Sequence, residues 1–492
     1  MTNDHIAKDI INIFKENWIN DFIIDTKNKK TYTYSDFFTF AYYGKIYLNE
    51  HQINDKVALI YDNSIELAVF YFAALLNGNI VIPIDPLKGF EEIKEIIEES
   101  KCESVITDDI KVKEYLCDIK ILNLDENDKI NIFKRENIEK KTLEIFKDVD
   151  FSTVYSITFT SGSTGKPKGV MHTFENFYLT SRAFSKQFGF NSRNTFYHNL
   201  PMTYMAGILN LIILPFLSQS KIIVAGRFNI SRLMNFWDHP IELKANTFFF
   251  IPTILSMLLR IDRSSEGAEY TKNTNITACV ATAPLNLKVK DKFEKKYGVN
   301  LYESYGLSET LFVSTNSPYN EKNEGVGKIL EGAEIEFWEE NEILIEVPWQ
   351  FKGYYNVDSS DLFVNDKFCS GDMGEYENEN YLFITGRKKD IIIRGGINIS
   401  PKKIENVVLE TDLFADFHII GVKNNILGEK IVCCYVEKEN FTKEVKADLN
   451  KKLMAVLGIN YQVDEYFKVK NIPKNINGKV DKFELLKLYH NK

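Results

Sequence analysis

Several features of other protein classes are missing from this sequence. The chain has six cysteines among 492 residues, with no CxxC pair and no regular spacing, which predicts reduced thiols rather than disulfides or zinc ligands. Its seven histidines show neither HExxH nor HxxxH spacing, so they are expected to be scattered core and surface residues. Chemistry that depends on sulfur or on a histidine metal centre is therefore not indicated.

Long apolar runs and an excess of positive charge are also absent. The apolar segments Gly207–Leu217 and Phe248–Leu259 are shorter than the roughly 20 residues of a spanning helix, and the N-terminus lacks the pattern of a secretory signal. Sixty Lys and Arg against 69 Asp and Glu give a net charge of −9, the wrong sign for binding a phosphate backbone. We expect a cytoplasmic protein with no membrane span and no nucleic-acid partner.

The first half of the chain alternates strand and helix patterns. Lys56–Tyr61 and Asn79–Ile84 are predicted strands, and the apolar segment Glu66–Asn77 between them is a predicted helix. The same alternation recurs in Ser152–Lys221 and in Asn275–Gly306. Strands joined by crossover helices are typical of parallel sheets, so an α/β fold is expected.

The second half has a different character. Glu342–Val347 and Tyr381–Thr385 are predicted strands of a β-rich region, whereas Val445–Leu457 has helical spacing. A chain of 492 residues also exceeds what one core usually supports. We predict a large N-terminal domain, residues 1–387, with parallel-sheet αβ subdomains and a β-rich part. A small mobile α+β domain, residues 388–492, follows it, with the boundary near Lys388 and Lys389.

The strongest local signal is the segment TSGSTGKPKG at residues 160–169, which follows a predicted strand and precedes a predicted helix, Thr173–Phe188. Three glycines, four hydroxyls and two lysines within ten residues can surround a polyphosphate with backbone N–H groups, O–H groups and positive charge. The common nucleotide loop GxxxxGK[ST] is not matched, because Pro167 follows Lys166. The candidate phosphate-binding residues are Thr160, Ser161, Gly162, Ser163, Thr164, Gly165 and Lys168.

These residues and four further segments resemble one family. The sequence is similar to the adenylate-forming superfamily of acyl-CoA synthetases, firefly luciferases and peptide-synthetase adenylation domains, over nearly the whole chain. The segment at 160–169 resembles the phosphate loop of that superfamily. The other matching segments, in the same order along the chain, are YGLSE at 305–309, SGD at 370–372, GRKKD at 386–390 and PKNINGK at 473–479.

The resemblance implies roles for single residues in nucleotide binding. Tyr305 would lie against adenine, Ser308 would contact the α-phosphate, and Glu309 would bind Mg²⁺. Asp372 and Arg387 would bind the ribose. An aromatic face, a hydroxyl donor and hard oxygen ligands suit these partners chemically.

The resemblance also implies catalytic and hinge residues. Lys479 would enter the active site from the C-terminal domain, and with Lys168 and Glu309 it is a candidate catalytic residue. Lys389 would be the pivot between the two domains. In relatives the small domain swings after the first reaction, and we expect the same motion here.

The activity implied is that of an AMP-forming acid–thiol ligase. A small carboxylic acid would attack ATP in the presence of Mg²⁺, giving an acyl-adenylate and pyrophosphate, and no general base is needed because a carboxylate is already ionised at pH 7. The acyl group would then pass to CoA or to the phosphopantetheine of an acyl-carrier protein. The alternatives are a stand-alone adenylation enzyme that loads a carrier protein, and a non-catalytic binding relative.

The acid-binding residues are implied by two segments that depart from the family pattern. Pro201–Gly207 has Tyr204 where relatives often have histidine, and it contains no aspartate to pair with the ammonium of an α-amino acid. Residues 281–285 read ATAPL instead of GGAPL, and the Thr282 side chain favours a small, substituted or aromatic acid over a long chain. The substrate-binding candidates are Tyr204, Ala281, Thr282 and Gly306.

Overall fold

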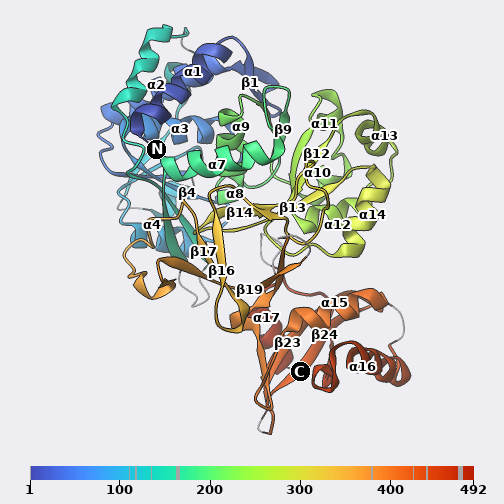
Figure 1. Ribbon diagram of the computed structural model, residues 1–492. Coiled ribbons are helices and arrows are strands. Elements are labelled where there is room, and N and C mark those ends of the chain that lie inside the picture. Colours follow the sequence, from blue (N-terminus) through green and yellow to red (C-terminus); the bar gives the residue numbers. More distant parts are fainter. Residues whose placement is uncertain are drawn as a thin grey trace.

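The computed structural model describes residues 2–109, 111–116, 119–134, 136–161, 167–377, 381–424, 426–438, 441–474 and 480–491. The N-terminal three quarters form a large α/β body, and the last hundred residues form a smaller α+β part at one end of it (Figure 1). The predicted α/β class with parallel sheets is confirmed. No helix among the described residues combines the length and the apolar character needed to cross a membrane.

A six-stranded sheet carries the first strand–helix–strand unit. Its order is β6-β5-β3-β4-β7-β8, and the neighbours are parallel except for β7 and β8. Helix α3 (Ile65–Asn77) begins where the Ser64 side chain accepts a hydrogen bond from the Leu67 N–H, and it ends at Gly78, whose φ of 77° suits glycine. The strands are β3 (Lys56–Ile60), β4 (Ile80–Ile84), β5 (Ser104–Thr107), β6 (Lys120–Asn123), β7 (Val154–Ser161) and β8 (Pro167–Thr173).

A larger sheet of 14 strands, counted over the described residues, carries most of the remaining body. Its order is β16-β17-β19-β20-β15-β14-β13-β12-β11-β9-β10-β1-β2, with β18 beside β19. The run from β13 to β1 is parallel and the rest is antiparallel. The strands are β1 (Asp21–Asp25), β2 (Lys30–Thr33), β9 (Thr195–His198), β10 (Lys221–Val224), β11 (Thr247–Phe250), β12 (Thr277–Val280), β13 (Leu301–Leu307), β14 (Leu311–Thr315), β15 (Lys328–Ile329), β16 (Glu334–Phe337), β17 (Glu342–Glu346), β18 (Phe363–Val364), β19 (Lys367–Glu377) and β20 (Tyr381–Arg387).

Helices pack on these two sheets, and aromatic residues contribute much of the core formed by the helices and strands. Phe174, Phe177, Phe184 and Phe188 form the buried face of α7 (Phe174–Phe188), which crosses the body in Figure 1. The other helices of the body are α1 (Asn3–Asn17), α2 (Tyr34–Glu50), α4 (Phe90–Ser100), α5 (Val112–Tyr115), α6 (Glu126–Phe133), α8 (Met205–Ile208), α9 (Leu214–Leu217), α10 (Ile230–Met234), α11 (Asp238–Glu242), α12 (Pro252–Ile261), α13 (Glu266–Asn273) and α14 (Leu287–Tyr297).

The C-terminal part has cores of its own. Leu382 still packs in the core of the body, whereas Ile392 already belongs to a second cluster that extends to Val463. Between them lies the short 3₁₀ helix Lys388–Asp390. The elements of this part are β21 (Ile392–Arg394), β22 (Ile397–Ile399), α15 (Pro401–Thr411), β23 (Phe414–Asn424), β24 (Gly428–Glu437), α16 (Lys443–Leu457), β25 (Glu465–Lys468) and α17 (Lys482–His490).

The structure differs from expectation around the predicted phosphate loop. The sequence suggested a strand followed by a loop and a helix, but β8 lies between loop and helix and pairs antiparallel with β7, with Thr160 opposite Lys168. Helix α7 begins only at Phe174, where Thr173 and Asn176 form a reciprocal cap. Residues 167–173 therefore form a strand, which the sequence did not predict because proline is rare inside strands.

Candidate active site

The β7–β8 hairpin brings two of the predicted phosphate-binding residues together. Thr160 and Lys168 are register partners, and the Thr160 hydroxyl donates to the Lys168 carbonyl oxygen at 3.5 Å. Gly162, Ser163, Thr164 and Gly165 lie outside the described residues, and of Ser161 only the backbone is described, at the end of β7. The pairing of β7 with β8 therefore places Thr160 and Lys168 side by side.

A loop that sequence reasoning did not single out joins this hairpin to Glu309. The Met171 N–H donates to the Gly353 oxygen at 3.1 Å, and the Tyr355 N–H donates to the Gly169 oxygen at 2.8 Å. The same loop also contacts Glu309, because the Phe351 N–H donates to the Glu309 backbone carbonyl oxygen at 2.9 Å. Backbone contacts thus hold β8 and Glu309 at a fixed separation.

Tyr354, on this loop, contacts two of the three predicted catalytic residues, Glu309 and Lys168. Its hydroxyl donates to Glu309 Oε1 at 2.5 Å, and the Lys168 Nζ lies 5.0 Å from the centre of its ring. Burial and the nearby Glu309 charge raise the pKa of Tyr354, so the phenol keeps its proton at neutral pH. No local pattern in the sequence indicates this residue, because Tyr354 contacts positions that are far apart along the chain.

Ser308 is positioned by a buried histidine. His172, on β8, is fully buried, and its Nε2 lies 2.7 Å from the Ser308 carbonyl oxygen, so this nitrogen donates. Burial lowers the pKa of His172 to about 4, and the ring is neutral at pH 7. The expectation that the histidines are core and surface residues therefore fits His172, which supports the backbone of a predicted site residue.

Three residues from the strands β13, β19 and β20 meet at the predicted ribose site. The Tyr305 hydroxyl donates to Asp372 Oδ2 at 2.9 Å, and Arg387 Nε lies 2.8 Å from Asp372 Oδ1. Asp372 and Arg387 are register partners on β19 and β20, while Tyr305 is on β13. The Asp372 side chain is only 4% exposed, and these two donors stabilise its charge.

The two predicted acid-binding segments line one small cavity. Its volume is about 20 Å³, and its walls are Leu200, Pro201, Tyr204, Ala206, Phe228, Ile251 and Thr282. Burial raises the pKa of Tyr204, the charge of Glu309 raises it further, and the charge of Arg387 lowers it. These electrostatic effects indicate that the cavity lies near the nucleotide-site residues.

The remaining predicted acid-binding residues have backbone roles. Ala281 does not line the described cavity wall, and its N–H donates to the Phe250 oxygen at 3.2 Å. Gly306 lies at an irregularity between β13 and β14, where a β-carbon would come within 1.8 Å of the Leu311 oxygen. Only glycine fits at position 306, since a side chain there would displace the neighbouring strand.

The residues on either side of the predicted hinge residue, Lys389, each form an ion pair. The Lys388 Nζ is 2.7 Å from Glu342 Oε2 of the body, and Asp390 Oδ1 is 2.8 Å from the Lys482 Nζ of α17. Lys389, between these two, has an exposed side chain. Lys479 lies outside the described residues.

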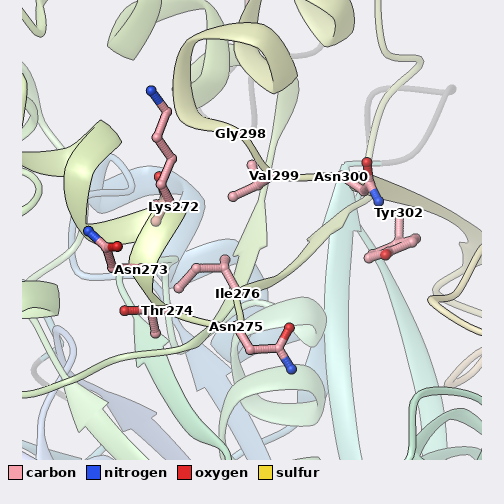
Figure 2. A pocket seen from close by; sticks show the side chains of 10 residues that line it. Lys272, Asn273, Thr274, Asn275, Ile276, Gly298, Val299, Asn300 and Tyr302 are labelled. Carbon is pink, nitrogen blue, oxygen red and sulfur yellow. The ribbon is translucent and has the colours of Figure 1, made fainter.

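A second, larger cavity is separate from these residues. It has a volume of about 400 Å³ and lies where α13 leads into β12 and α14 leads into β13. Figure 2 shows its polar border, which includes Asn273, Asn275 and Asn300. None of the residues predicted from the sequence is among those that line it.

Comparisons with known proteins show the family to which the chain belongs. The family model described as AMP-binding enzyme matches residues 18–355, and the model of the AMP-binding enzyme C-terminal domain matches residues 403–479. The chain is 27% identical over 353 residues to the 2-succinylbenzoate–CoA ligase of Listeria innocua, covering 71% of this chain and 73% of that protein. It is 25% identical over 470 residues to the enzyme of the same name from Bacillus subtilis, covering 92% of each.

Solved structures share the fold over the full length. ATP-bound MatB from Rhodopseudomonas palustris has a TM-score of 0.85 at 21% identity, covering 98% of this chain and 99% of that one. The o-succinylbenzoate CoA synthetase of Bacillus subtilis, in complex with ATP and magnesium ion, has a TM-score of 0.80 at 22% identity, covering 96% and 98%.

Proposed function

Since the chain belongs to the AMP-binding enzyme family, we propose that it is an AMP-forming acid–thiol ligase. It joins a carboxylic acid to the α-phosphate of ATP, releases pyrophosphate, and transfers the acyl group to CoA. Relatives named as CoA ligases for 2-succinylbenzoate and malonate support this activity. The observation that carries the proposal is the Tyr305–Asp372–Arg387 group, which begins four residues before Glu309 on the chain.

The nucleotide binds through residues that already carry matching donors and acceptors. Asp372 accepts one hydrogen bond from Tyr305 and lies against Arg387, but a carboxylate has about four lone-pair sites, so the ribose hydroxyls can donate as well. Tyr305 is buried and offers a flat aromatic surface for adenine. The Ser308 hydroxyl is the proposed donor to the α-phosphate.

The first reaction brings two anions together. A carboxylate about 4 Å from a phosphate charge is repelled by about 4 kcal/mol at an effective dielectric constant near 20. Lys168 supplies positive charge beside Glu309 and Tyr354, and Lys479 supplies a second charge near the attacking carboxylate. The substrate carboxylate needs no general base, because it is already ionised.

Glu309 fits a magnesium site that the substrate completes. Among the described residues, no three His, Cys, Asp or Glu side chains cluster to form a metal site of protein ligands alone. Mg²⁺ usually takes one or two carboxylates together with phosphate oxygens and water, and one Glu309 oxygen already accepts from Tyr354 while the carboxylate retains further lone pairs. When bound, magnesium supplies charge that offsets the charge of the phosphates.

The second reaction requires Lys479 to leave and a thiol to enter. We propose that residues 388–492 form a separate domain that turns about Lys389. Separate hydrophobic cores on either side of this residue, and its exposed side chain between two ion pairs, support such a motion. The acyl-adenylate is then open to the pantetheine thiol of CoA.

The test is acid-dependent exchange of labelled pyrophosphate into ATP, followed by thioester formation. We expect exchange with an acid from a broad panel, and thioester when CoA is added. A phosphopantetheinylated carrier protein in place of CoA tests the other acceptor, and a preference for it would change the proposed acceptor only. If no acid supports exchange, the proposed function is wrong.

Lys479→Ala separates the two half-reactions. We expect the variant to lose exchange by roughly 100-fold or more while it still converts supplied acyl-adenylate and CoA to thioester. Lys474→Ala is the matched control, since Lys474 pairs with Asp416 on the C-terminal sheet at 2.7 Å. Equal loss of both half-reactions in a folded Lys479→Ala protein would contradict the role of Lys479 in the first step alone.

A further inference from the structure

The cavity beside Tyr204 has an uncharged lining. Its seven described wall residues include no Lys, Arg, His, Asp or Glu. Leu200 and Ile251 are 4% and 5% exposed, so the walls are continuous with the packed core. A substrate that carries a second charge would have to bury it here without a partner, which is strongly unfavourable.

The nearest arginine along the chain does not change this balance. Arg227 precedes the wall residue Phe228, but its Nε lies 2.7 Å from Asp62 Oδ1 and its Nη1 lies 2.8 Å from Asp85 Oδ1. One guanidinium and two carboxylates together carry a net negative charge. The Arg227 Nη2 is buried without a hydrogen-bond partner among the described residues, but Arg227 is not one of the residues that line the cavity.

The size of the cavity limits the length of the acid. A volume of about 20 Å³ holds little more than one water molecule, and the wall residues Leu200 and Ile251 are buried. Cores are packed as densely as organic crystals, so a long chain would have to displace several of these side chains. The geometry favours an acid with few carbon atoms.

Thr282 combines two unfavourable features within this wall. Its φ is +79°, a backbone conformation in which a β-branched residue is an outlier. Its hydroxyl is also buried and has no hydrogen-bond partner among the described residues. Strain and unpaired polar groups of this kind persist where a ligand makes use of them.

From these observations, and on the basis of the proposed function, we infer the class of the acid. It is a short carboxylic acid whose remainder is uncharged and bears one hydrogen-bonding group, such as a hydroxyl, that pairs with the hydroxyl of Thr282. Thr282 is therefore a specificity-determining residue. It selects against dicarboxylic, amino and long-chain acids together with the rest of the uncharged wall.

The test compares kcat/KM for pyrophosphate exchange across a panel of acids with the full chain. The probes are butanoate, its 2-, 3- and 4-hydroxy derivatives, malonate, succinate, 4-aminobutanoate and octanoate. We expect one hydroxy acid to give the highest value, and the dicarboxylic, amino and eight-carbon acids to be at least roughly 10-fold poorer.

Variants at position 282 identify the group responsible. Thr282→Val removes the hydroxyl but keeps the shape, and we expect it to lower the ratio of kcat/KM for the best hydroxy acid to kcat/KM for butanoate roughly 10-fold or more. Thr282→Ser should retain the preference. Thr282→Gly relieves the backbone strain, so its melting temperature should rise while the preference is lost.

The outcomes separate the two proposals. Exchange that is fastest with malonate, succinate, 4-aminobutanoate or octanoate would overturn the inferred class and leave the ligase activity intact. Equal losses for butanoate and the hydroxy acid in Thr282→Val would overturn the role of Thr282. Exchange with no acid at all would overturn the proposed function, and the inference with it.

Discussion

Tyr354 holds Glu309 through a hydrogen bond of 2.5 Å from its phenol to Oε1, while the Lys168 ammonium lies over the same ring. A single side chain thus connects the proposed phosphate lysine with the proposed magnesium ligand. The loop that carries Tyr354 is itself bonded to β8 and to the Glu309 backbone, so the three residues are held together by main chain as well as side chain. This arrangement gives Tyr354 a positioning role.

Removing the Tyr354 hydroxyl should leave the Glu309 carboxylate less firmly positioned, while the ring next to the Lys168 ammonium is retained. A hydrogen bond to a charged group contributes about 1.5–3 kcal/mol, and each 1.4 kcal/mol corresponds to a factor of about 10. In Tyr354→Phe we therefore expect the Mg²⁺ concentration for half-maximal pyrophosphate exchange to rise roughly 10-fold. The measurement is exchange rate against Mg²⁺ at fixed ATP, together with binding of ATP by calorimetry with and without Mg²⁺.

The matched control for this change is Tyr355→Phe. Tyr355 is the next residue, and its ring lies near the Lys56 ammonium rather than near Glu309. Its Mg²⁺ dependence should remain that of the parent protein. An unchanged Mg²⁺ dependence in Tyr354→Phe would show that the hydrogen bond does not position the metal ligand.

The positively charged side chain of Lys168 should be needed for the exchange reaction. We expect Lys168→Ala to lower kcat/KM for ATP in the exchange reaction by about 100-fold or more, because the positive charge offsets charge on the phosphates as the leaving group departs. Lys352→Ala, a change at an exposed lysine on the adjoining loop, serves as the control and should have little effect. Similar losses in both variants would point to a general change of net charge instead.

Asp372 should affect both nucleotide binding and stability. Its carboxylate is nearly buried, and Asn at this position keeps one oxygen for Tyr305 but leaves Arg387 without a charged partner. We expect Asp372→Asn to raise the KM for ATP roughly 10-fold and to lower the melting temperature by a few degrees. Steady-state exchange kinetics and thermal unfolding measure the two effects.

The control for Asp372→Asn is the same change at the exposed Asp361. It should alter neither the KM for ATP nor the melting temperature. If Asp372→Asn loses stability but binds ATP normally, the carboxylate serves the fold and not the ribose.

Local patterns in the sequence predicted the elements that local interactions determine. The helix expected over Glu66–Asn77 is found at Ile65–Asn77. Ser64 and Gly78 cap its two ends, and its apolar side chains are buried around its whole circumference. The strands on either side of it differ from expectation by one residue each. Hydrophobic periodicity and caps act over a few residues, so the sequence carries this information directly.

Long-range contacts could not be predicted in the same way. The pairing of β8 with β7 was missed, and so was Tyr354, whose contacts to Lys168 and Glu309 join residues far apart along the chain. Family resemblance indicated Tyr305, Asp372 and Arg387 one at a time, but not the hydrogen bond and ion pair between them. Such contacts depend on how sheets pack, which a local pattern does not specify.

His172 should make the protein less stable in acid. Its pKa is about 4 in the folded chain against 6.5 for an ordinary histidine, because burial disfavours the charged ring. Below pH 6.5 the unfolded chain binds a proton that the folded chain does not, so stability falls with pH until about pH 4, where both forms are protonated. At 1.36 kcal/mol per pH unit, His172 lowers the free energy of unfolding by about 3 kcal/mol over this range. Above pH 6.5 it does not make the free energy of unfolding depend on pH. Urea unfolding at pH 7.5 and at pH 4.5 measures this loss of stability. Between these pH values, the urea concentration at the unfolding midpoint should fall less for His172→Gln than for the parent protein. His5→Gln, a change at an exposed position in α1, is the control and should show the same fall as the parent protein. Equal drops in all three proteins would mean that His172 is not the source of acid sensitivity.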